Sequence, residues 1–215
     1  MALTSLEFLV VVAIFLADQA GLIPVTKTPV LLAVAWLSLR LRGLRWRSVG
    51  LVRPASWSRA IAVGTAAGIA MELLALFVTE PLFARLAGAD PGLEEFRPLV
   101  GHLGLTLLLI LASWVIAAFG EEAFYRGYLM HRVAALAGGS RASWVVALVV
   151  ATAMFGWAHA VGQGLTGALQ EGFAGLLLGL VFLASGRTLA IPIIAHGVSN
   201  TLAFVLIYFG KYPGV

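Results

Sequence analysis

Cysteine is absent from this 215-residue chain, and charged residues make up only 11% of it. Without cysteine the chain has no disulfide framework and no zinc site built on thiolates. Soluble domains contain roughly 25% charged and about 45–50% apolar residues, whereas this chain is 61% hydrophobic and has a mean hydropathy of +1.00. The composition therefore excludes an ordinary soluble domain and predicts an integral membrane protein.

Long apolar segments fill most of the chain, and none of them shows a strand pattern. A bilayer core of about 30 Å requires about 20 apolar residues in a helix. The segments that reach or approach this length are 4–23, 28–42, 59–79, 103–120 with a continuation to 136, 142–159, 172–185 and 188–209. We predict an all-α polytopic membrane helix bundle with about seven (roughly six to eight) membrane-embedded helices, residues 1–215 forming one domain.

Glycine and proline indicate two local irregularities in this bundle. Gly162, Gly164 and Gly167 predict an irregular loop between the fifth and sixth segments. Pro192 lies in the last segment, where it either kinks the helix or is accommodated within it.

The net charge of +4 comes mostly from arginine, and six arginines fall close together. The arginines between the second and third segments are Arg40, Arg42, Arg45, Arg47, Arg53 and Arg59. Such a loop is typically cytoplasmic, which places the N-terminus on the cytoplasmic side and loop 80–102 on the other. We interpret these arginines as a topology signal and not as a nucleic-acid site. We expect a multi-pass protein of a bacterial or archaeal cell membrane whose partners include the lipid bilayer.

Three short motifs place polar side chains in these apolar segments, where a charge near the bilayer centre costs at least about 2.5–3.5 kcal/mol. They are Glu121-Glu122-Ala123-Phe124-Tyr125-Arg126, Phe155-Gly156-Trp157-Ala158-His159 and His196-Gly197-Val198-Ser199-Asn200. An intramembrane acid is a functional hypothesis by default. Together the motifs supply carboxylates, a guanidinium, imidazoles and a carboxamide, which is sufficient for general-base hydrolysis of an amide.

Helical spacing separates the two glutamates of the first motif. Glu122 and Arg126 are four residues apart, so we predict an ion pair between them. Glu121 is rotated by about 100° from Glu122 around a regular helix, which leaves it free to face a cavity and accept a proton. A structural Glu–Arg pair at a helix end is the alternative for this motif.

The other two motifs also contain residues one helical turn apart. Phe155 precedes His159 by four residues, so its ring can pack on the imidazole and support it. His196 and Asn200 share a helix face. The alternatives are an interfacial histidine in the second motif and an interhelical hydrogen bond in the third.

Two hydrolytic schemes use these residues. In the metal-free scheme, Glu121 with His159 activates a water while His196 and Asn200 donate hydrogen bonds to the oxyanion. In the metal scheme, Glu121, His159 and His196 bind zinc. The sequence has no His-Glu-x-x-His pair, so we favour the metal-free scheme, with no cofactor, and keep zinc as the alternative.

The distances of these residues from their helix ends predict different depths in the membrane, so straight, upright helices would not bring them together. Glu121 is 11 residues from Arg132, and His159 is 18 residues from Arg141. At 1.5 Å per residue these separations are roughly 16 and 27 Å. The residues can converge only if helix 142–159 tilts strongly or the loop at 137–144 dips into the membrane.

The three motifs, in this order, resemble those of the CAAX prenyl protease type II family, also called the CPBP or Abi intramembrane protease family. This family includes the Ras-converting enzyme endopeptidases. The resemblance covers residues 103–209, whereas residues 1–102 match only as generic membrane spans. It implies that Glu121 activates water with help from His159. It further implies that Glu122 and Arg126 support them and that His196 with Asn200 forms the oxyanion side.

We therefore expect an intramembrane endopeptidase that hydrolyses a peptide bond in a peptide or membrane-protein substrate, prenylated or not. One alternative is an ion-coupled transporter with a Glu/His proton relay, although the sequence shows none of the inverted repeats typical of such carriers. The other alternative is a non-catalytic membrane scaffold of the immunity type.

Overall fold

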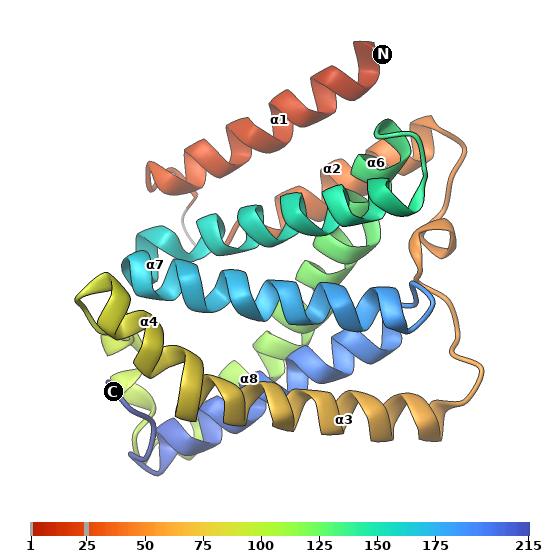
Figure 1. Ribbon diagram of the computed structural model, residues 1–215. Helices are drawn as coiled ribbons and strands as arrows, with labels where there is room; N and C mark the ends of the chain where they lie inside the picture. The colour runs from red at the N-terminus through yellow and green to blue at the C-terminus, as the bar shows by residue number, and fades with distance from the viewer. Residues whose placement is uncertain (1, 24–25) are drawn as a thin grey trace.

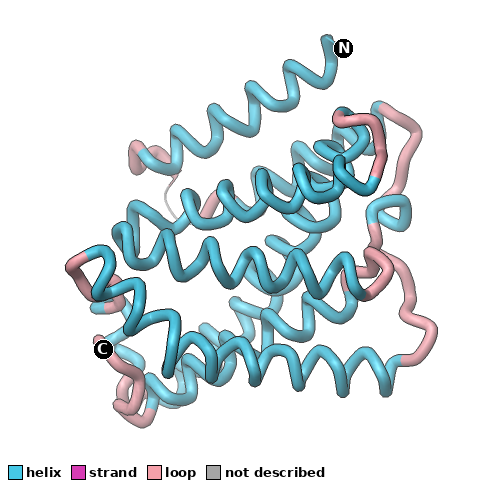
Figure 2. Tube along the Cα trace, viewed as in Figure 1, coloured by secondary structure: helices cyan, strands magenta, loops and turns pink. Residues whose placement is uncertain are grey.

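The computed structural model describes residues 2–23 and 26–215, and every regular element within these ranges is helical (Figures 1 and 2). The predicted all-α class is confirmed. The α-helices are α1 (Ala2–Gln19), α2 (Thr28–Leu41), α3 (Trp57–Leu74), α4 (Glu80–Ala87), α5 (Leu103–Ala112), α6 (Met130–Leu136), α7 (Arg141–Ala184) and α8 (Ala190–Tyr208). Short 3₁₀ turns lie at Trp46–Val49 and Glu94–Leu99.

Four continuous helices are long and apolar enough to cross a membrane. They are Trp57–Ala87, Leu103–Leu136, Arg141–Ala184 and Ala190–Tyr208. Helix α2 is apolar but shorter. Large apolar side chains such as Leu108 and Phe77 are exposed on these helices. Exposed apolar surface of this extent is unusual for a soluble monomer and suits contact with lipid.

Some predicted boundaries are wrong because helices continue through expected loops. A π-helical turn, Ala75–Thr79, joins α3 to α4, so Glu80 begins a helix and does not lie in a loop. The fifth and sixth predicted segments join in α7, where only Gly164 is non-helical (φ 66°, ψ −164°). Glycine has no Cβ and adopts this left-handed φ without strain. The expected irregular loop is therefore a reversal at one residue, after which the arms 141–163 and 165–184 run side by side (Figure 1).

Pro192 is accommodated at the start of the last helix. Helix α8 begins at Ala190, so the proline occupies the first turn, where no amide donor is needed. The carbonyl of Thr188, which a proline leaves without its usual partner, accepts a hydrogen bond from the Ser185 hydroxyl at 3.1 Å.

The basic loop and the N-terminus lie at one end of the bundle, and the C-terminus lies at the other (Figure 1). The backbone N–H of Leu189 donates to the carbonyl of Gly50 at 2.9 Å, which holds the basic loop on the turn before α8. This is the arrangement that the predicted topology requires. The cytoplasmic location of that end stays a prediction.

Helices α3 and α8 pack closely because glycine faces the contact. A Cβ at Gly68 would meet the carbonyl oxygen of Ala195 and lie 2.8 Å from the Val198 Cβ. We expect Gly68→Val to lower the thermal unfolding temperature of the detergent-solubilised protein, since overpacking costs about 1–3 kcal/mol. Gly104→Val is the matched control, because a Cβ at Gly104 meets nothing within 4 Å. Equal unfolding temperatures for both variants would contradict this packing.

Candidate active site

Two π-helical segments, Ser113–Glu121 and Ala123–Leu129, lie on either side of Glu122, and Glu121 is the last residue of the first one. The regular α-helix expected here is therefore wrong in detail: these segments bond from i to i+5 and are wider than an α-helix. Such π turns are rare and occur frequently at functional sites. The two glutamates still point to different surroundings, since Glu122 is fully buried and Glu121 lines a pocket.

Glu122 anchors a buried ion-pair network. Its Oε1 lies 2.6 Å from Arg126 Nη1, so the predicted ion pair is present, and both side chains are at most 1% exposed. The same oxygen lies 2.9 Å from Nδ1 of His196, which comes from α8. Arg126 also donates through Nη2 to the carbonyl of Gly175 at 2.8 Å. An ion pair and hydrogen bonds thus connect charged and polar groups on three helices in a buried position.

Phe155 links this network to the second motif. The Arg126 guanidinium lies 4.7 Å from the centre of the Phe155 ring, a cation–π contact. The ring centre is 5.0 Å from the imidazole of His159 and 6.1 Å from that of His196. The predicted packing of Phe155 on His159 is therefore present, and the same ring also contacts the other imidazole.

The hydrogen bond of His159 defines which ring nitrogen is free. Its Nδ1 lies 2.8 Å from the backbone carbonyl of Phe155. A carbonyl can only accept, so Nδ1 carries the proton and donates. In the neutral imidazole this leaves Nε2 with a lone pair.

Glu121, His159, His196 and Asn200 line one pocket of about 170 Å³. The depth conflict is resolved by the helix Leu103–Leu136, which runs obliquely across α7 (Figure 1). Residues at unequal distances from their helix ends therefore reach the same place. The candidate residues come from three helices and meet around one space.

Ser113 is a site residue that the motifs did not reveal. Asn200 donates through Nδ2 to the Ser113 hydroxyl at 2.9 Å. The serine is buried in the π-helical segment that ends at Glu121. The only signal in the sequence is a small polar residue within an apolar helix.

The donor set does not fit a metal ion. No three His, Asp or Glu side chains among residues 2–23 and 26–215 lie close enough together to hold one. Glu121, His159 and His196 line one pocket but do not form such a group.

A second pocket, of about 100 Å³, adjoins the first. The two share His196, Asn200, Glu80 and Glu171, and the second also contains Glu72. No motif in the sequence points to Glu72 or Glu171, and Glu80 was expected in a loop.

Comparison with known proteins gives one family. Residues 103–202 match the family model of Rce1-like proteins, described as type II CAAX prenyl endopeptidase Rce1-like. The matched range is a little under half of the chain and contains all three motifs. No curated protein and no solved structure matches the chain. The resemblance found in the motifs is thus confirmed, and over this range the chain is similar to a family of proteases.

Proposed function

We propose that the protein is an intramembrane endopeptidase that uses a glutamate-activated water. The observation that carries the proposal is the meeting of Glu121, His159, His196 and Asn200 around one pocket between membrane-spanning helices. The family match supports peptide-bond hydrolysis and favours a prenylated peptide or protein as substrate.

Water activation falls to Glu121 with His159. The Glu121 carboxylate takes a proton from water as the oxygen attacks the carbonyl carbon of the scissile bond. His159 holds its Nδ1 proton on the Phe155 carbonyl, so its Nε2 can accept a hydrogen bond from the same water. When the tetrahedral intermediate collapses, Glu121 returns the proton to the leaving amine.

Oxyanion stabilisation falls to His196 and Asn200. Glu122 accepts the Nδ1 proton of His196 and stabilises its imidazolium, which donates through Nε2–H. Asn200 uses one amide hydrogen on Ser113 and has a second to donate. Both donors are held by buried partners, so little reorganisation is needed when negative charge develops.

Cleavage of a farnesylated peptide ending in Cys-aliphatic-aliphatic-X tests the proposal. Purified protein in lipid vesicles is incubated with the peptide, and fragments are identified by mass spectrometry. The metal-free scheme predicts the same rate with and without EDTA. The rivals, a transporter and a non-catalytic scaffold, both predict no fragments at all.

Asn200→Ala should lower kcat by about 10²–10³-fold, the usual effect of removing one oxyanion donor. Asn200→Asp is nearly isosteric but has no amide donor, so it should lose a similar factor. Ser113→Ala leaves the donor present but unanchored, and its loss should be smaller. Cleavage rates of Asn200→Ala within threefold of the unmodified protein would remove Asn200 from the oxyanion site.

A further inference from the structure

The second pocket gathers carboxyl groups from two continuous helices, Trp57–Ala87 and Arg141–Ala184. Glu72 comes from α3, Glu80 from α4 and Glu171 from the second arm of α7. The pocket is continuous with the candidate active site, since both contain His196 and Asn200. Its volume is about 100 Å³, whereas a cavity that holds one water needs roughly 10–15 Å³. There is room for the end of a side chain but not for a folded segment.

Glu72 has an acceptor without a partner. The side chain is only 5% exposed, and one carboxylate oxygen accepts a hydrogen bond from the Ser199 hydroxyl at 2.7 Å. The other oxygen is buried and has no hydrogen-bond partner. A buried acceptor left in this way costs about 1–3 kcal/mol, and more when it is charged. A donor from a bound molecule would remove that cost.

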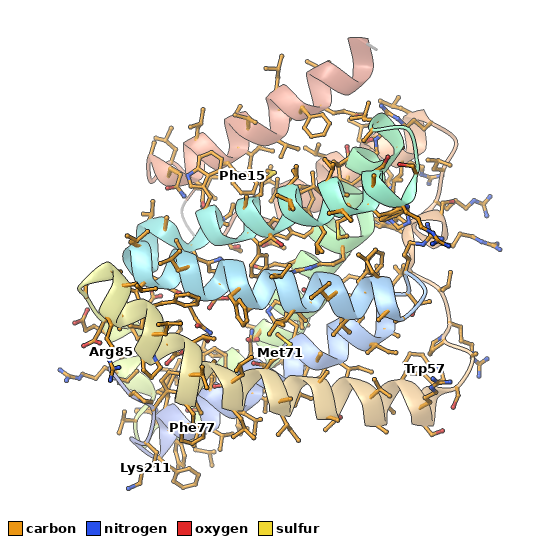
Figure 3. The ribbon with its side chains drawn as sticks, viewed as in Figure 1. Phe15, Trp57, Met71, Phe77, Arg85 and Lys211 are labelled. Atoms are coloured by element: carbon orange, nitrogen blue, oxygen red, sulfur yellow. The ribbon has the colours of Figure 1, made fainter. Side chains whose placement is uncertain are left out.

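Among the described residues, no lysine or arginine lines this pocket. Among the residues that the structure describes, no Lys or Arg forms an ion pair with Glu72, Glu80 or Glu171. Arg85 and Lys211, at the same end of the bundle, project outward from it (Figure 3). The three carboxyl groups are therefore not paired with a Lys or Arg of the described residues.

Tyr212 fixes one wall of the pocket without neutralising it. Its hydroxyl donates to Glu80 at 2.5 Å. Burial, together with the nearby carboxylates, raises the pKa of Tyr212 above its usual value, so the hydroxyl stays protonated and continues to donate. Glu80 is thereby held in place, whereas one buried oxygen of Glu72 has no partner.

We propose that this pocket binds the cationic side chain of a substrate lysine or arginine close to the scissile bond. That the ligand is a peptide follows from the proposed function, on which this proposal rests. An ammonium or guanidinium supplies donors for unpaired carboxylate oxygens. A peptide carboxylate is repelled, so a free C-terminus has to lie elsewhere. A metal ion is disfavoured because no three acidic or histidine side chains of the described residues converge closely enough.

Matched peptides test this preference. In a farnesylated peptide, each position flanking the scissile bond is occupied in turn by lysine, norleucine or glutamate. At one position lysine should raise kcat/KM at least tenfold over norleucine, and glutamate should be the poorest. The double variant Glu72→Gln with Glu171→Gln should bring the lysine-to-norleucine ratio close to one. Glu171→Lys should shift the preference towards glutamate.

The ratio within each variant is the readout, so a general loss of activity does not mimic the result. Glu95→Gln is the matched control, because Glu95 is an exposed carboxylate, and it should keep the full preference. No preference for lysine at any position, or an unchanged preference in the double variant, would overturn the proposal even if cleavage itself is observed.

A binding measurement keeps the proposal separate from catalysis. The lysine and norleucine peptides are labelled with a fluorophore and titrated with Glu121→Gln protein in detergent. Fluorescence anisotropy gives a Kd for each peptide, and the ratio of the two Kd values is the readout. Tighter lysine binding that is lost with Glu72→Gln and Glu171→Gln supports the pocket even if the unmodified protein cleaves nothing. Equal binding of both peptides, combined with no cleavage preference, rejects it.

Discussion

Replacing Glu121 by glutamine should lower peptide cleavage by at least about 10²–10⁴-fold, the usual contribution of a general base. Glutamine has nearly the same shape but cannot take a proton from water. Because Glu121 lines the pocket and forms no ion pair among the described residues, its removal should not unfold the protein. Cleavage rates and thermal unfolding temperatures, measured on the same vesicle preparations, check both expectations.

Glu95→Gln provides the control for loss of a carboxylate at an exposed position and should cleave at the normal rate. A Glu121→Gln protein that cleaves within threefold of the unmodified protein would refute the role of Glu121. If Glu121→Gln does not reach the membrane, Glu121→Asp is tested in its place. Aspartate keeps the carboxylate, but its shorter side chain places that carboxylate farther from the water. That variant should retain measurable cleavage at a reduced rate.

Replacing Arg126 by alanine should cause the largest loss of stability. Removing one partner of a buried ion pair leaves an uncompensated charge and costs about 3–5 kcal/mol. The variant also loses the hydrogen bond to the Gly175 carbonyl and the contact with the Phe155 ring. Activity should fall as well, because Glu122 can no longer be held where it accepts from His196. Thermal unfolding in detergent measures the first effect, and peptide cleavage measures the second.

Two further variants separate the effect of burying the ion pair from the effect of losing a charge. Lys27→Met breaks the Lys27–Asp18 pair, whose side chains are 15% and 19% exposed, so its loss should cost less than the loss of a fully buried pair. Combining Arg126→Met with Glu122→Gln removes both buried charges, so it should recover part of the lost stability without recovering activity. An unfolding temperature for Arg126→Ala no lower than that of Lys27→Met would contradict the assignment of a buried network.

Local spacing was sufficient to predict part of this site. The four-residue interval predicts the Glu122–Arg126 pair and the packing of Phe155 on His159, and both are present. Contacts of this kind depend only on one helix. The sharing of Glu122 by Arg126 and His196 joins two motifs, and it depends on how α8 crosses the helix Leu103–Leu136.

The remaining differences also arise from tertiary structure. Glu72 and Glu171 are single acids in apolar helices, with no motif around them, and only helix packing brings them to one pocket. The π-helical segments on either side of Glu122 have no distinct hydrophobic period to reveal them. The reversal at Gly164 uses a glycine that could equally serve a loop. The oblique crossing of helices removes a depth conflict that straight, upright helices would impose.

One measurement tests the central claim that this pocket is a peptide-hydrolysing centre. The unmodified protein and Glu121→Gln, each in vesicles, are incubated with the farnesylated peptide in ¹⁸O-labelled water, and the fragments are analysed by mass spectrometry. We predict that the unmodified protein releases a fragment whose new carboxylate carries one ¹⁸O, and that Glu121→Gln releases almost none. Absence of any fragment, or equal release by both proteins, would contradict the account.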